Sequence, residues 1–384
     1  MTEAPKIRIL TAAALACGIA VAQPLSAGSA EWVSAADETS GSAVSFGAVS
    51  DSGTFPIASG VVLPERAGLP EGTAPTWRMI SQTVPEDAEQ GPLFANAAEA
   101  ARKTSNPLGG DFMVLINEWH YTSLEGSLSD GSRETISHIF QPVIPFSLEE
   151  TIGEDWIMVN RPTLPIIYSA EVPDGFDFGK GVATFSSKSG VADLQLFSLI
   201  GVSKPQESNP LLGAGDLVLA GGFSLSFPTG SAAFTSNAWA AGPAGVAAYI
   251  GEKGVLGALV QTQFQYASSG PTPVDHNKMF VQPFYLWSLG GGWQVGGTPL
   301  WTFDFETDEE EIPLGFGFQK VQLFKLGEGK MLPVRFGLEA RYFVDQMNSS
   351  LANEWEIVFQ ISPILPNIFG NLLKGCPVMS VGGC

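Results

Sequence analysis

Three histidines, His120, His138 and His276, are the side chains best suited to proton transfer in this 384-residue chain. A hydrolase needs a serine hydroxyl, a histidine and an orienting polar group within hydrogen-bond reach. His120 and His138 could be neighbours across a hairpin, with Ser123 or Ser137 nearby, but no spacing fixes that geometry. A barrel-embedded lipid hydrolase therefore stays an alternative, and we predict no catalytic residue and no enzyme.

The sequence also predicts no cofactor and no metal site. The glycine runs at 290–292 and 296–297 lack the helix that must follow a phosphate-binding loop, so they indicate turns or crowded strands. The acidic cluster of Glu306, Asp308, Glu309, Glu310 and Glu311 could attract divalent cations that bridge lipopolysaccharide. We favour the simpler interpretation, in which this cluster is a solvated loop tip.

Charges and amides recur at every second position in several segments, which is the period of a β-strand. Between 331 and 345 and again between 353 and 362, one face is apolar and the other polar. In a membrane barrel the apolar face meets lipid and the polar face lines the lumen. The predicted lumen-lining residues are Arg335, Glu339, Arg341, Asp345, Glu354, Glu356 and Gln360, together with Gln261, Gln263 and Gln265. Phe280, Phe284 and Leu286 are also assigned to the inner face, where they suit either an apolar solute or a packed interior.

About twelve such segments follow one another with turn signals between them. They lie near 112–122, 136–147, 155–170, 190–202, 215–228, 239–250, 254–267, 278–289, 292–304, 311–324, 331–345 and 353–364. Most match the roughly nine to eleven residues that cross a bilayer at a tilt. The sequence therefore predicts an all-β fold, an antiparallel transmembrane β-barrel of about 12 strands over 106–365. A secreted β-sandwich is the competing interpretation. Seven prolines inside these segments predict bulges or shortened strands, particularly between 142 and 165.

The segments that flank the barrel have their own signatures. Lys6 and Arg8 precede an apolar run and small residues, so 1–22 is predicted to be a signal peptide, with cleavage as late as 30. Residues 31–84 are rich in Ser, Ala, Gly and Pro and predict a mostly unstructured N-terminal extension. Residues 85–105 predict a short helix, interpreted as a simple linker rather than a plug. The C-terminal tail, 366–384, holds Cys376 and Cys384, which could form a disulfide or remain unpaired.

An ordered series of motifs resembles a known family. The series comprises Asn106-Pro107-Leu108, Gln141 to Phe146, Asn160 to Pro165, Gly190 to Gln195, Gly213 to Leu217, Leu225 to Thr229, Trp239 to Pro243, Val281 to Tyr285 and Ile312 to Gly317. Over roughly 106–365 the chain resembles the outer-membrane β-barrel family of the meta-pathway of phenol degradation, whose members are labelled transporters. The resemblance implies uptake of aromatic or other small hydrophobic compounds by a Gram-negative bacterium, and it accounts for the prolines.

Composition and resemblance together predict a bacterial outer-membrane channel for small, hydrophobic or aromatic solutes. Two alternatives stay open besides the hydrolase: a closed-lumen barrel that serves structure or surface interaction, and the sandwich. The expected partners are outer-membrane lipid, lipopolysaccharide, the barrel-insertion machinery and a small-molecule solute. A net charge of −20 argues against nucleic acid as a partner.

Overall fold

The computed structural model describes residues 94–373 apart from 95, 107, 109, 111, 154, 208, 271–274, 328–329 and 347–350. The predicted signal peptide, the extension, both C-terminal cysteines and all of 85–93 lie outside the described residues. The described chain forms fourteen strands and two short helices. The strands are β1 Phe112–Glu125, β2 Arg133–Ser147, β3 Trp156–Asp177, β4 Val182–Val191, β5 Leu194–Gln206, β6 Gly215–Phe227, β7 Ala238–Gly251, β8 Gly254–Ser268, β9 Asn277–Gly290, β10 Trp293–Gly297, β11 Trp301–Asp304, β12 Glu309–Gly327, β13 Lys330–Asp345 and β14 Ala352–Pro366. The helices are α2 Ala97–Lys103 and α3 Ile368–Leu373.

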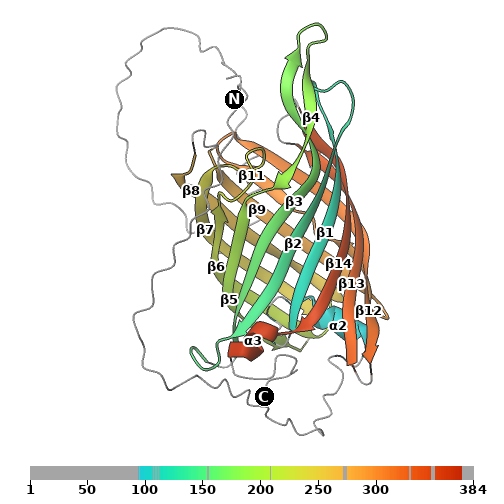
Figure 1. The fold of residues 1–384 in the computed structure, drawn as a ribbon. Helices are drawn as coiled ribbons and strands as arrows, with labels where there is room; N and C mark the ends of the chain where they lie inside the picture. The colour runs from blue at the N-terminus through green and yellow to red at the C-terminus, as the bar shows by residue number, and fades with distance from the viewer. Residues whose placement is uncertain are drawn as a thin grey trace, which may run out of the picture. The chain divides into compact units, whose positions relative to one another are not determined.

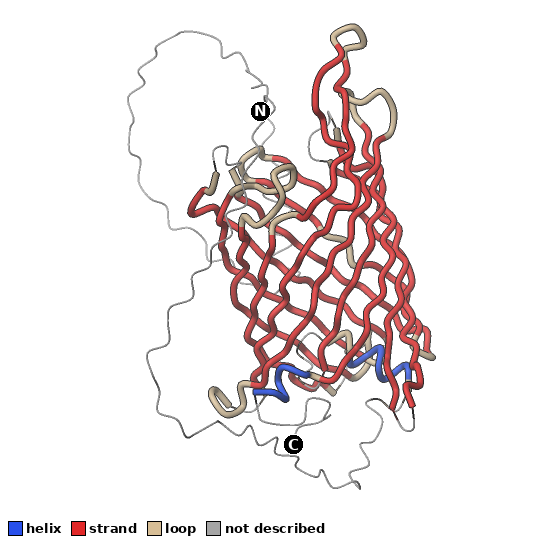
Figure 2. Tube along the Cα trace, viewed as in Figure 1, coloured by secondary structure: helices blue, strands red, loops and turns tan. Residues whose placement is uncertain are grey.

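All strands are antiparallel and belong to one sheet that closes on itself, because β1 pairs with β14 (Figures 1 and 2). β4 and β5 both pair with β3, and β10 and β11 both lie between β9 and β12. Each of these two pairs is one wall strand with a break, so fourteen strands minus two breaks make twelve wall strands. The predicted antiparallel barrel of about 12 strands is confirmed.

The period-2 pattern sets which side chains face outward. On β13, Leu338 and Tyr342 are 42% and 57% exposed, whereas Glu339 and Arg341 are both 8% exposed. Exposed apolar side chains recur in this way along the other strands, for example Leu219, Leu256 and Phe359. An apolar outside and a polar inside are typical of a barrel in a bilayer. The alternation thus assigns each residue of a strand to the outer or the inner surface.

Exposed aromatic side chains gather near both ends of the wall. Trp156, Trp287 and Trp293 lie near the end that carries α2 and α3, here called the helical end. Trp239, Tyr266 and Tyr342 lie near the opposite end, here called the loop end. Amphipathic aromatic rings at two levels are the arrangement that the interfaces of a bilayer favour.

The two helices lie at the helical end of the barrel (Figure 1). α2 begins at Ala97 because the Asn96 side chain caps it, accepting a hydrogen bond from the Glu99 N–H at 2.9 Å. It is shorter than the predicted helix over 85–105. Near α3, the Asn367 Nδ2 donates to the carbonyl oxygens of Gly110 and Pro145 at 2.9 and 2.7 Å. These bonds fasten the start and the end of the barrel to β2. Neither helix of the described residues is long and apolar enough to cross a membrane.

The prolines distort the wall less than predicted. β2 and β3 keep their full length through Pro142, Pro145, Pro162 and Pro165, although the pairing between them is interrupted at 141–143 and 161–163. Their register shifts lie near Ile136, Ile167 and Pro173. The expectation of shortened strands between 142 and 165 is therefore wrong. Of these prolines, Pro299 alone lies at a break in a wall strand, between β10 and β11. The break between β4 and β5 falls at Ala192 and Asp193, where no proline stands. The glycines at 290–292 form a turn, as expected, with φ of 85°, 57° and 85° that favour glycine.

Candidate functional site

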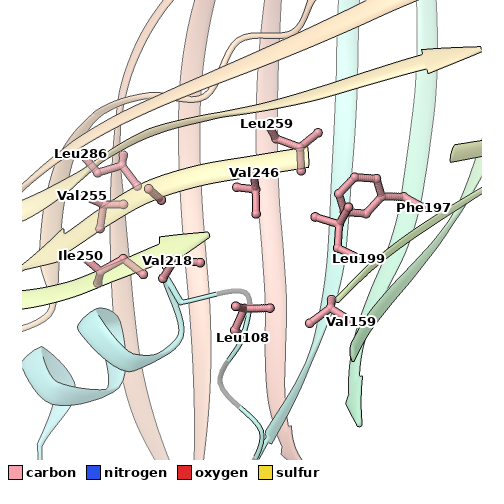
Figure 3. Close-up of a cluster of buried hydrophobic side chains, with 11 residues drawn as sticks. Leu108, Val159, Phe197, Leu199, Val218, Val246, Ile250, Val255, Leu259 and Leu286 are labelled. Atoms are coloured by element: carbon pink, nitrogen blue, oxygen red, sulfur yellow. The ribbon is translucent and has the colours of Figure 1, made fainter. Parts of the chain in front are cut away.

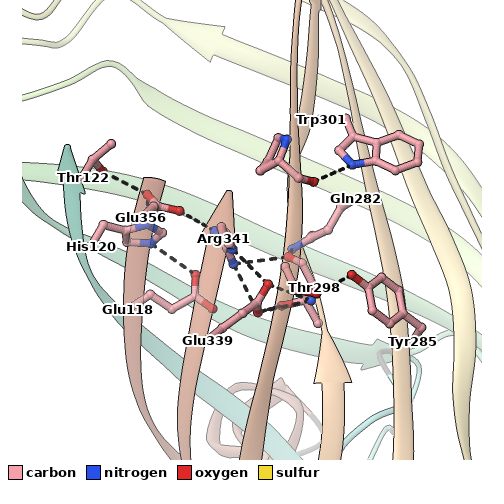
Figure 4. Close-up of polar contacts among 12 residues, drawn as sticks. Glu118, His120, Thr122, Gln282, Tyr285, Thr298, Trp301, Glu339, Arg341 and Glu356 are labelled. Carbon is pink, nitrogen blue, oxygen red and sulfur yellow. Dashed lines mark hydrogen bonds and ion pairs between the residues drawn. The ribbon is translucent and has the colours of Figure 1, made fainter. Parts of the chain in front are cut away.

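One side of the interior carries a connected set of charged side chains from β1, β13 and β14, the charged wall (Figure 4). Arg341 is at its centre, donating from Nε to Glu339 Oε1 at 3.0 Å and from Nη1 to Glu356 Oε2 at 2.9 Å. The His120 Nδ1 lies 2.8 Å from Glu356 Oε1, and its Nε2 lies 3.7 Å from Glu118 Oε2. Buried charges persist where they are paired and hydrogen-bonded, and this set meets that condition along most of its length.

The break at Pro299 supplies backbone groups to the charged wall. Proline has no N–H and a fixed φ, so the wall strand stops pairing there. The freed Thr298 N–H donates to both carboxylate oxygens of Glu339 at 3.2 Å, and its Oγ1 donates to Oε2 at 3.1 Å. The Thr298 carbonyl accepts from Arg341 Nη2 at 3.3 Å. The break in the strand thus frees the backbone of Thr298 to form hydrogen bonds with the buried Glu339 and Arg341.

The opposite side of the interior, formed mainly by β6 to β9, is apolar and is called the apolar wall (Figure 3). Its members are Val218, Val246, Ala248, Ile250, Val255, Leu259 and Leu286, and Val159, Phe197 and Leu199 of β3 and β5 continue it. These strands therefore bear apolar side chains on their inner face as well as on their outer face.

Between the two walls the chain that precedes β1 crosses the lumen. This lumen plug comprises the described residues between 94 and 110. α2 packs beside β12, where Phe94, Ala100 and Ala101 cluster with Val321. From there the Arg102 guanidinium lies 3.7 Å from Asp216 of β6, and Leu108, 2% exposed, is buried in the apolar wall (Figure 3). The segment predicted to be a simple linker therefore lies inside the barrel at its helical end.

Next to the lumen plug, the walls enclose a cavity of about 180 Å³. Glu118, Arg335 and Gln360 line it from the charged side, and Val246, Leu259 and Phe284 from the apolar side. Thr104, Ser105 and Asn106 of the plug border it as well. Arg335 ties the plug to β13, because its Nη2 donates to Thr104 Oγ1 at 2.7 Å and to Ser105 Oγ at 3.3 Å.

The ten predicted lumen residues fall into four groups. Glu339, Arg341 and Glu356 meet in the charged wall, and Arg335 and Gln360 line the cavity. Gln261 and Gln263 are buried further along β8. Gln265, Glu354 and Asp345 lie near the loop end, and Asp345 is exposed there rather than part of the charged wall. The inner face of β9 carries Phe284 and Leu286 into the cavity lining, as its spacing suggested.

His120 and His138 lie on adjacent strands but face opposite sides of the wall. His120 pairs with Ser137 in the register and is buried in the charged wall. His138 pairs with Trp119 and stacks on it with 4.7 Å between ring centroids, beside the exposed Tyr168. The histidine pair that the sequence allowed therefore does not form, because alternation separates the two rings. Among the described residues no group of three His, Cys, Asp or Glu side chains is placed to hold a metal ion.

Another polar cluster, formed by Gln263, Ser224 and His276, lies nearer the loop end. The Gln263 Nε2 donates to Ser224 Oγ at 3.1 Å, and its Oε1 lies 2.8 Å from the Nε2 of His276. Burial, together with the nearby Lys278, lowers the pKa of His276, which precedes β9. The neutral imidazole with its hydrogen on Nε2 donates to Gln263. This cluster fixes a buried glutamine that the sequence assigned to the lumen.

Two charged residues that line the cavity were not among the predicted set. Glu118 alternates with His120 and Thr122 along β1, a polar set between Trp119 and Tyr121 that the period-2 rule could have found. Arg161 is followed by Pro162, and of the residues two positions away only Thr163 is polar, so no clear sequence signal singles it out. Both line the cavity.

No family model matches the chain. No curated protein matches it either. Among solved structures, it is similar to a FadL homologue from Pseudomonas aeruginosa, with 10% identity and a TM-score of 0.31 over 72% of this chain and 96% of that one. It is also similar to a mutant of the monoaromatic hydrocarbon channel TodX, with 11% identity and a TM-score of 0.31 over 72% and 95% of the two chains. A third, OccK7 of Pseudomonas aeruginosa, has 8% identity and a TM-score of 0.26 over 66% and 98%. At such values the function must be argued from the residues of this chain.

Proposed function

We propose that the chain is a bacterial outer-membrane channel for small apolar or aromatic solutes, with the cavity between the two walls on the solute path. The observation that carries this proposal is a partly apolar cavity of about 180 Å³ inside a closed barrel whose outer surface is apolar. A cavity lined by both polar and apolar side chains is the kind of space in which a channel binds and passes a small solute. A twelve-stranded barrel is also wider than the eight-stranded barrels that side chains fill.

The remaining parts of the chain take roles in this proposal. Residues 1–22 serve as the export signal, 31–84 as an extension in the periplasm, and 106–365 as the barrel. The partners are outer-membrane lipid, lipopolysaccharide and the insertion machinery. The sequence resemblance to the phenol meta-pathway family supports an aromatic solute. Cys376 and Cys384 of the tail could form a disulfide or remain unpaired.

The lumen plug favours a second candidate, a closed barrel that passes nothing. Its segment crosses the lumen at the helical end and is held by Arg335 and by the burial of Leu108. A channel requires this segment to move aside, whereas a structural barrel requires it to stay. No observation favours the hydrolase, because the ring nitrogens of His120 face Glu356 and Glu118 rather than a serine.

Two measurements test the proposal. In SDS gels, the unheated membrane fraction should run at a different apparent size from the boiled sample, as a closed barrel does. In planar bilayers, replacing 97–106 by a Gly-Ser linker should produce steady currents, while the wild type opens only intermittently. The absence of currents from both proteins would rule out the channel and leave the closed barrel.

A further inference from the structure

The charged side chains that line the cavity are not balanced in sign. They are Glu118, Arg161 and Arg335, two cations and one anion. Neither arginine comes within ion-pair distance of any described carboxylate, whereas Arg341 pairs with two. The residues that line the cavity therefore carry one formal positive charge, and charges interact more strongly beside a protein wall than in water.

Both guanidinium groups also hold hydrogen-bond donors without acceptors. Within the described chain, the Nε atoms of Arg161 and Arg335 are buried and have no partner. Arg161 stacks over the ring of Phe197 at 5.0 Å, which holds the group in place. A buried donor left unpaired destabilises the fold. An acceptor that enters this space and reaches either Nε removes that destabilisation.

A third unpaired atom in the cavity is the Gln319 Oε1. The amide can rotate to present its Nε2 instead, so Gln319 is able to serve an acceptor as well. Three residues that line one cavity, on β3, β12 and β13, thus each hold a buried polar atom without a partner. Convergent polar groups in an apolar cavity are the usual mark of a ligand site.

The rest of the lining limits the size and character of the ligand. Apolar side chains from Val114 and Ile116 on one side to Val246, Leu259 and Phe284 on the other form most of it. A cavity of about 180 Å³ is comparable to the engineered cavity of 150 Å³ that binds benzene. One aromatic ring or one branched alkyl group fits this space.

We propose that the cavity binds a small carboxylate with an apolar body, its carboxylate at Arg161 and Arg335 and its body against Val246, Leu259 and Phe284. A guanidinium fork matches a carboxylate in two hydrogen bonds. A neutral hydrocarbon would leave the donors and the charge without partners, and inorganic phosphate would leave the apolar surface unfilled. The inference deepens the proposed function and rests on it for the route by which the ligand arrives.

Calorimetric titration of the purified barrel in detergent at pH 7.5 tests the inference, with benzoate as probe and benzyl alcohol as its neutral counterpart. Benzoate is expected to bind at least about tenfold more tightly, which corresponds to about 1.4 kcal/mol. Arg161→Gln should weaken benzoate binding by a similar factor. Arg133→Gln, which removes an arginine paired with Glu171 near the loop end, should leave it unchanged.

Equal binding of benzyl alcohol and benzoate, or benzoate binding that survives Arg161→Gln, would overturn the site. If Arg161→Gln does not give a heat-modifiable barrel, Arg161→Lys decides instead, because it keeps the charge but loses the fork. This titration does not depend on transport. Benzoate binding without solute uptake would refute the channel alone, whereas uptake of neutral aromatics without benzoate binding would refute the site alone.

Discussion

The charged wall and the apolar wall face each other across one lumen, yet they are built in different ways. On β13 and β14 the outward residues are apolar and the inward residues charged, so neighbours in sequence differ sharply in character. On β7 and β8 both faces carry apolar residues, for example the inward Leu259 and the outward Leu256. The first wall holds its shape through ion pairs, the second through close packing.

This difference suggests that the two walls respond differently to substitution. An ion network loses stability when one member is removed, because its partners are left charged and unpaired. A packed apolar wall next to a cavity tolerates a change of shape better, but any side chain that fills the cavity blocks the solute. The predictions below test this contrast, beginning with the largest expected effect.

Arg341→Leu should destabilise the barrel most. The change leaves Glu339 and Glu356 without their shared guanidinium, and breaking a buried pair costs about 3–5 kcal/mol. Urea unfolding in lipid vesicles, followed by tryptophan fluorescence, measures this loss. Arg133→Gln, which breaks a partly exposed pair, should cost at most about 1 kcal/mol. Equal losses in the two variants would mean that the charged wall contributes no special stability.

Leu108→Ala should loosen the lumen plug. Leu108 is buried among the apolar wall residues, and truncating a buried leucine costs about 2–5 kcal/mol, here at the lower end because the plug is short. We expect more frequent channel openings in planar bilayers. Leu211→Ala removes an exposed leucine at the same end of the barrel and serves as control. Unchanged openings in Leu108→Ala would show that the apolar wall does not hold the plug.

Asp193 offers a smaller test outside both walls, at the break between β4 and β5. Although burial opposes ionisation, hydrogen bonds from Ser236 and Gly230 hold the pKa of this carboxyl below its usual value. A carboxyl with a lowered pKa stabilises the fold above its ordinary pKa and loses that contribution as the pH falls through the folded value. Asp193→Ala should therefore cost about 1–2 kcal/mol at pH 7, and the difference from wild type should disappear in acid. Unfolding curves at pH 7 and at pH 3 or below measure it, and a difference that persists in acid would assign the effect to packing.

Alternation in the sequence was sufficient for the wall strands and for the part of the charged wall on β13 and β14. Glu339, Arg341 and Glu356 stand between apolar neighbours, so their spacing alone places them on one face. The same rule has nothing to distinguish at Val246 or Leu259, where both faces are apolar. The sequence therefore indicated only the β9 side of the cavity, through Phe284 and Leu286.

The lumen plug could not be predicted for a different reason. Its helix has the capping residue and charge order of any short helix, and these local signals do not say where the helix docks. Only the closed barrel shows that Leu108 and Arg335 hold the segment inside the lumen. Arg161 is a similar case, since its role depends on the strands that surround it.

The most direct test of the account compares Leu259→Trp with Leu256→Trp. The two variants make the same change three residues apart on β8, the first into the cavity at a residue 7% exposed, the second toward lipid at a residue 45% exposed. The measurement is the initial uptake of a radiolabelled monoaromatic solute by cells that express each variant at equal levels of folded barrel. We predict that Leu259→Trp lowers uptake to the level of cells without the protein, while Leu256→Trp leaves it at the wild-type rate. Equal uptake by both variants would contradict the claim that the solute passes between the two walls.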